Sequence, residues 1–203
     1  MDDIVKSVLR MQYDSPDGDD IASAEDLRKI ALHEAGHLVV CEALCPGSVG
    51  LASIRRSGGR GRGGFIHRCK SLSGRVEYTL VSLGGKAAVE LYYADSCTLG
   101  CKDDIQRAFT MLRDGMSEEG MLGFGMIDVA TNRFSETSES MNARGEAVTQ
   151  ALLEHYMTKT RSILFQNRDF LELTADRLLE KETLLYSDIQ DIRGNCKAKI
   201  YVN

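Results

Sequence analysis

The chain has 203 residues, of which 43% are hydrophobic and 27% are charged, and its formal net charge is −5. This composition is typical of a globular domain, and the negative charge argues against nucleic acid as a partner. No apolar run reaches the roughly 20 residues that span a bilayer, and the acidic start, Met1-Asp2-Asp3, lacks a secretory hydrophobic segment. We therefore expect a cytoplasmic chain with reduced cysteines.

Two regions are expected along the chain. Residues 1–22 combine a short helix over 1–13 with an acidic linker, and residues 23–203 form the main domain. We expect a mainly α-helical fold, because long segments carry apolar residues at helical spacing and proline occurs only twice. A small β-sheet or hairpin is expected near residues 49–68.

The first helix of the main domain has clear end signals. Ser23, followed three residues later by Asp26, is a typical N-cap, and Pro46-Gly47 ends the helix. Inside it lies the motif His33-Glu34-Ala35-Gly36-His37. The two imidazoles lie one helical turn apart and can bind one zinc ion, while the glutamate between them can reach a water on the metal.

The next segment changes character. Val49–Ile54 is a plausible strand, and Phe65-Ile66-His67 is a plausible return strand. Between them, Arg55–Gly64 holds five glycines and four arginines. Because this tract is short and the net charge is negative, we interpret it as a hairpin tip beside an active site rather than as an RNA-binding segment.

Helices dominate the rest of the chain. They are expected over 74–94, 103–116, 139–166 and from about 168 to 182, with loops over 95–102 and 117–138. Ser187 and Gln190 form a capping box for a last short helix. Gly84-Gly85 indicates close contact between helices. No segment has the pattern of a phosphate-binding loop, which excludes ATP hydrolysis by that route.

A catalytic zinc usually has three protein ligands, so a third ligand is required. The two remaining histidines, His67 and His155, are better explained as surface or structural residues. Two carboxylates are the better candidates, namely Glu90 and Asp104, each on a helix after the motif. Sequence spacing does not choose between them.

Four stretches resemble the peptidase domain of FtsH-type ATP-dependent zinc metalloproteases. They are Ala31–Val40 (ALHEAGHLVV), Leu83–Leu91 (LGGKAAVEL), Thr98–Ala108 (TLGCKDDIQRA) and Asn167–Thr183 (NRDFLELTADRLLEKET). They run in the family's order over most of residues 24–193. This is far more specific than the five-residue motif alone.

The resemblance implies that Asp104 is the third zinc ligand. Asp103, which stands where the family has Asn, and Glu90 are alternative ligands or residues that orient a histidine. The family also implies a sheet edge that binds an extended substrate, expected at Val49–Ile54 and Gly63–Phe65. Gly64 and Phe65 are then the candidate substrate-binding residues.

The leading hypothesis is a zinc endopeptidase with one Zn²⁺ per chain, held by His33, His37 and Asp104. Glu34 would activate a water on the metal, and the substrates would be unfolded or flexible polypeptides. The family implies a hexameric ring and an ATPase module, in the same chain or a separate one. The alternative is a non-catalytic, metal-stabilised docking or regulatory module that partners an ATPase.

A further hypothesis uses the cysteines. Cys41 and Cys45 form one Cys-x-x-x-Cys pair, and Cys97 and Cys101 form another. Together they could bind a separate structural zinc. Cysteines one helical turn apart are poorly spaced for this purpose, and buried free thiols are common, so we favour the latter.

Overall fold

The computed structural model describes residues 23–55, 63–94, 100–121 and 139–201, leaving aside the side chains of 117–118 and 139–142. The expected helix over 1–13, the acidic linker, most of the Arg/Gly tract and Cys97 lie outside these ranges.

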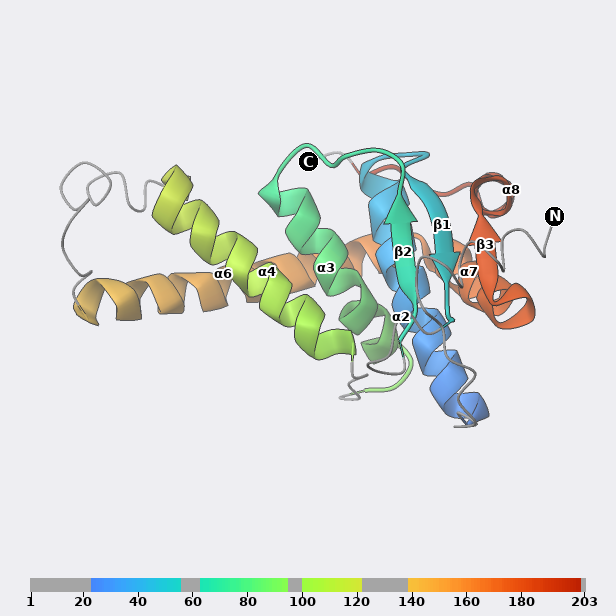
Figure 1. Ribbon diagram of the computed structural model, residues 1–203, viewed down its shortest axis with the longest axis horizontal. Coiled ribbons are helices and arrows are strands. Elements are labelled where there is room, and N and C mark those ends of the chain that lie inside the picture. The colour runs from blue at the N-terminus through green and yellow to red at the C-terminus, as the bar shows by residue number, and fades with distance from the viewer. Residues whose placement is uncertain (1–22, 56–62, 95–99, 122–138, 202–203) are drawn as a thin grey trace.

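The described part is mainly helical with one small antiparallel sheet, which confirms the predicted fold class (Figure 1). The elements are α2 (Ala24–Leu44), β1 (Val49–Ser53), β2 (Phe65–Arg68), α3 (Arg75–Glu90), α4 (Gly100–Glu119), α6 (Glu139–Gln166), α7 (Arg168–Lys181), β3 (Thr183–Leu185) and α8 (Tyr186–Asn195). Helix α4 begins before the predicted start and continues past the predicted end at Met116. Among the described helices, none combines the length and the low charge content that crossing a bilayer requires.

Helix α2 is the centre of the fold. Ser23 caps it as predicted, because its Oγ accepts the backbone N–H of Asp26 at 3.1 Å. Every residue from Ala31 to Ala43 is buried, so the second half of the helix is enclosed on all sides. It packs against α3, α6, α7 and strands β1 and β2.

Helix α3 approaches α2 very closely, as Gly84-Gly85 predicts. A Cβ on Gly36 would overlap the carbonyl oxygen of Gly84 and would lie 2.6 Å from Cβ of Ala88. Glycine at position 36 therefore lowers the helix propensity of α2 but allows the two backbones to touch. This contact fixes α3 against the motif-bearing turn of α2.

The sheet has the strand order β2-β1-β3, with both pairings antiparallel. Ser53 of β1 pairs with Phe65 on one side and with Thr183 on the other. The expectation that Val49–Ile54 offers a sheet edge is therefore wrong, because β1 is the central strand. Strand β3 was not predicted, since three residues between two helices give no alternating pattern.

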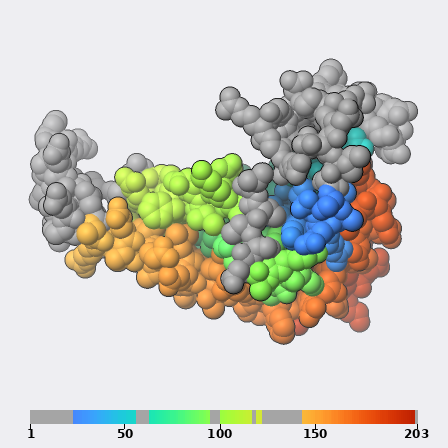
Figure 2. Space-filling view, turned by 90° about the horizontal axis from the view of Figure 1, so that it is seen from below, coloured from blue at the N-terminus to red at the C-terminus, as the bar shows by residue number. Residues whose placement is uncertain are grey.

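Helix α3 lies between α2 and α4, and α6 crosses behind α3 and α4 (Figure 1). Seen from below, α4 and the first half of α6 form an arm that extends away from α2 (Figure 2). The sheet and α8 lie at the other end of the molecule.

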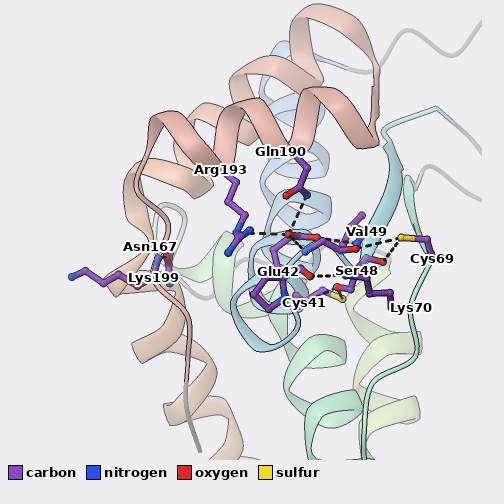
Figure 3. A network of polar contacts seen from close by, with 12 residues as sticks. Cys41, Glu42, Ser48, Val49, Cys69, Lys70, Asn167, Gln190, Arg193 and Lys199 are labelled. Carbon is purple, nitrogen blue, oxygen red and sulfur yellow. Dashed lines mark hydrogen bonds and ion pairs between the residues drawn. The ribbon is translucent and has the colours of Figure 1, made fainter.

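A buried carboxylate connects the end of α2 with β1 and α8 (Figure 3). Glu42 is 1% exposed and accepts the backbone N–H of Gly47 at 2.8 Å and of Val49 at 2.9 Å. Gln190 of α8 donates to the same carboxylate at 3.4 Å. These bonds fix where β1 leaves α2.

The predicted capping box of Ser187 and Gln190 is wrong. Helix α8 begins at Tyr186, and the Asp188 carboxylate accepts the backbone N–H of Leu185 at 3.0 Å. Gln190 reaches Glu42 instead. A capping interaction of the predicted type is present, but it begins two residues earlier, at Leu185 instead of Ser187, because β3 ends directly before the helix.

Candidate metal centre

Three buried side chains from two helices converge at one point. His33 and His37 come from α2, and Asp104 comes from the first turns of α4. Oδ2 of Asp104 lies 3.0 Å from Nε2 of His33 and 3.1 Å from Nε2 of His37, and the two Nε2 atoms are 3.1 Å apart. Within the described ranges, these residues form the one group of three or more His, Cys, Asp or Glu side chains that could hold a metal ion.

The His37 ring is held by a third helix. Its Nδ1–H donates to the backbone carbonyl of Val81 on α3 at 2.7 Å. This bond directs Nε2 towards His33 and Asp104. Histidines that bind metals commonly donate their other ring N–H to a carbonyl or a carboxylate in this way.

The electrostatics of the three groups are coupled. Burial raises the pKa of Asp104, but its hydrogen bonds to both histidines lower it well below its usual range. Burial lowers the pKa of His37, whereas the hydrogen bond and charge of Asp104 raise it to about 9. For His33, burial dominates and its pKa is lowered. A positive charge is therefore favoured at the point where the three side chains meet.

Glu34 lies beside this group and is 4% exposed. Burial raises its pKa to about 7, although the charge of His37 and a hydrogen bond from the backbone of Gly64 oppose the shift. A carboxyl group with a pKa near neutrality can both accept and donate a proton at the pH of the cell.

Glycine is required where the chain meets this glutamate. A Cβ on Gly64 would lie 2.5 Å from Cγ of Glu34 and would overlap the carbonyl oxygen of Ser53. Gly64 directly precedes β2, so the start of that strand lies against the Glu34 side chain.

Two further glycines enclose the imidazoles. A Cβ on Gly85 of α3 would lie 2.5 Å from Cε1 of His33 and 2.6 Å from Nε2 of His37. A Cβ on Gly100 of α4 would lie 3.1 Å from Nε2 of His33. The rings therefore have little room to turn.

The donor set fits zinc. Two imidazole nitrogens and one carboxylate oxygen are the ligand types found in catalytic zinc sites with three protein ligands. The donors are 3.0–3.1 Å apart. The edge between two ligands of a tetrahedral zinc with bonds of about 2.0–2.1 Å is about 3.3 Å, so a small outward shift accommodates the ion.

The other candidate residues lie elsewhere. Asp103 is exposed on α4. Glu90 lies at the end of α3, where its carboxylate pairs with Lys86 at 2.5 Å and with Arg161 at 2.7 Å. Phe65 is half-buried at the start of β2, and the two remaining histidines are exposed.

The cysteines do not form a second centre in the described part of the chain. Sγ of Cys41 lies 3.2 Å from Oγ of Ser48, and Cys45 belongs to no metal-competent group there. Cys101 is buried beside His33, with 3.8 Å between Sγ and Nδ1.

Sequence reasoning missed three contributors to this centre. Val81 acts through its carbonyl oxygen, which no side-chain pattern reveals. Gly85 was predicted to allow helix contact, but its position against the imidazoles was not. Cys101 was considered only as part of a cysteine pair. The signal that could have found it is helical spacing, since Cys101, Asp104 and Ala108 lie on the buried face of α4.

Comparison with known proteins defines the class. The profile of peptidase family M41 matches residues 20–192, and the chain belongs to this family. The predicted resemblance to FtsH-type peptidase domains is thereby confirmed.

The individual relatives compared with the chain are all named as proteases or protease components. The chain is 31% identical to "ATP-dependent zinc metalloprotease FtsH 2" of Symbiobacterium thermophilum, over 83% of this chain and 30% of that protein. It is 29% identical to "ATP-dependent zinc metalloprotease FtsH" of Mycoplasma mobile, over 87% of this chain and 28% of that protein. It is 25% identical to "Mitochondrial inner membrane m-AAA protease component yta12" of Schizosaccharomyces pombe, over 86% and 24% respectively. The chain thus spans less than a third of the length of these relatives.

Proposed function

We propose that this chain is a zinc-dependent endopeptidase that hydrolyses peptide bonds in unfolded or flexible polypeptides. The observation that supports it most is the convergence of His33, His37 and Asp104, with buried Glu34 beside them. Relatives named zinc metalloproteases support the same assignment.

In this proposal the three converging side chains hold one zinc ion per chain. The bound zinc supplies Lewis-acid polarisation of a water molecule and of the substrate carbonyl. Glu34 accepts a proton from the attacking water at a carboxylate oxygen and delivers it to the leaving amide nitrogen. Burial raises the pKa of Glu34, so its carboxylate is a stronger proton acceptor than an exposed one.

The substrate is proposed to bind as an extended strand along β2. Within the described sheet, β2 pairs with β1 alone, so its other side faces away from the sheet. Gly64 places the start of this strand against Glu34, which would bring a paired peptide close to the general base. Phe65 follows directly and would contact a substrate side chain.

We further propose that residues 23–203 act as one peptidase domain. Three relatives are named ATP-dependent or belong to an m-AAA protease. We therefore propose that the domain works with an ATPase module, in the same chain or a separate one, and assembles as a homo-oligomer, a hexamer by family resemblance.

The test compares the wild-type chain with Glu34→Gln on casein and on a quenched peptide. We expect cleavage with zinc, none after chelation, and a loss of about 10²- to 10⁴-fold in Glu34→Gln, which should still bind zinc. Activity that survives in this variant contradicts the proposal. Zinc binding without cleavage by the wild type would instead indicate the docking module.

A further inference from the structure

The first turn of α4 contacts both ring nitrogens of His33. Asp104 lies 3.0 Å from Nε2 through its Oδ2 atom. Cys101, three residues earlier, lies 3.8 Å from Nδ1 through its sulfur. Residues three apart on a helix share a face, so two side chains from one helical turn can contact the two ring nitrogens of a single imidazole.

This arrangement is enclosed. Cys101 is 1% exposed and His33 is 5% exposed. Gly85 of α3 and Gly100 of α4 lie against the same ring, where a Cβ on either would come within 3.1 Å of it. The sulfur therefore lies at a fixed place next to Nδ1, on a side of the ring that the protein encloses.

The position of the ring proton on each histidine decides which neighbouring atom must accept it. A neutral imidazole that presents the Nε2 lone pair to a metal carries its proton on Nδ1. At His37 the carbonyl oxygen of Val81 accepts this proton at 2.7 Å. At His33 the sulfur of Cys101 lies 3.8 Å from Nδ1 and can accept this proton as a weak hydrogen-bond acceptor.

We propose that Cys101 is a positioning residue for the metal centre, accepting the Nδ1–H of His33 and fixing the ring with Nε2 directed at Asp104. This inference rests on the proposed zinc site. Because Cys101 and Asp104 share one turn, the orientation of a ligand from α2 is set by the same turn that supplies the ligand from α4.

The test measures zinc affinity of the metal-free chain by competition with a chromophoric chelator. The variants are Cys101→Ala, Cys101→Ser and the matched control Cys41→Ala. Cys41 is also a fully buried thiol with a polar contact, to Ser48, and it takes no part in the metal centre. Melting temperatures of the metal-free variants measure any general loss of stability.

We expect Cys101→Ala to bind zinc about 10- to 100-fold more weakly than wild type, as removal of such outer partners typically does. Cys41→Ala should stay within about twofold, and Cys101→Ser should fall between wild type and Cys101→Ala. In the zinc-loaded chain, nitrogen-15 NMR should show a slowly exchanging Nδ1–H on His33 that exchanges faster in Cys101→Ala.

Two results would overturn the inference while leaving the zinc site intact. One is wild-type affinity in Cys101→Ala, and the other is an equal loss of affinity in Cys41→Ala. A wild-type chain that binds no zinc would overturn the proposed function, and this inference with it.

Discussion

Replacing Gly85 by alanine tests the packing of α3 against the two imidazoles. A Cβ at this position would lie 2.5 Å from Cε1 of His33, 2.6 Å from its Nδ1 and 2.6 Å from Nε2 of His37. Contacts below 3.0 Å cannot be kept, so either α3 must move away or the rings must turn.

The size of the effect follows from two opposing contributions. Alanine in a helix interior is favoured over glycine by about 1 kcal/mol. Overpacking a buried site typically costs about 1–3 kcal/mol. Because Gly36 and Gly84 already bring α2 and α3 into backbone contact, α3 has no room to adjust on its own. We expect Gly85→Ala to lower the free energy of unfolding by about 1 kcal/mol and to weaken zinc binding at least about 100-fold, since the donors shift.

The matched control is Gly194→Ala in α8, where a Cβ would meet nothing within 4 Å. This variant should gain up to about 1 kcal/mol in unfolding free energy and keep its zinc affinity. Urea unfolding of the metal-free chains and a chelator competition titration measure both quantities. Zinc affinity within threefold of wild type in Gly85→Ala would refute the described packing.

The remaining predictions concern single carboxylates and one strand. Asp104→Asn should lose at least about 100-fold in zinc affinity, whereas Asp103→Asn should stay within about threefold; equal losses would contradict the ligand assignment. Burial raises the pKa of Glu90, but bonds to two cationic neighbours lower it below its usual value. Glu90→Gln should therefore cost about 1 kcal/mol of stability above pH 5, and the difference from wild type should shrink as the pH falls below the usual glutamate pKa and through the lowered pKa of the folded state. Unfolding curves over a series of pH values from neutral to acid check this, and a difference that stays constant or grows towards acid pH would be contrary to it. Gly64→Ala should reduce kcat/KM at least about tenfold with zinc still bound, and Gly63→Ala, which meets no atom within 4 Å, should not. Similar activity in both variants would argue against close packing at Glu34, the proposed general base.

Much of the helical framework could be predicted from local signals. The Ser23 cap, the helical spacing of apolar residues and Pro46-Gly47 marked α2 closely, because each signal acts within a few residues. The same is true of the break at Asn167 between α6 and α7. Local chemistry decides such boundaries before any tertiary contact forms.

Non-local features could not be predicted in the same way. Strand β3 is three residues long and exists because β1 offers it a partner about 130 residues away in the sequence. The carbonyl of Val81 orients His37 only because α3 lies across α2. Helical spacing could have distinguished Asp104 from Asp103, because of these two only Asp104 shares the buried face of α4 with Ala108.

The central claim is that His33, His37 and Asp104 hold one zinc ion. The most direct measurement is a crystal structure of the zinc-loaded chain, with anomalous scattering at the zinc edge to place the ion. The account predicts one zinc per chain, bound by both Nε2 atoms and by an Asp104 carboxylate oxygen. Zinc located at other side chains, or no zinc bound at saturating concentration, would contradict it.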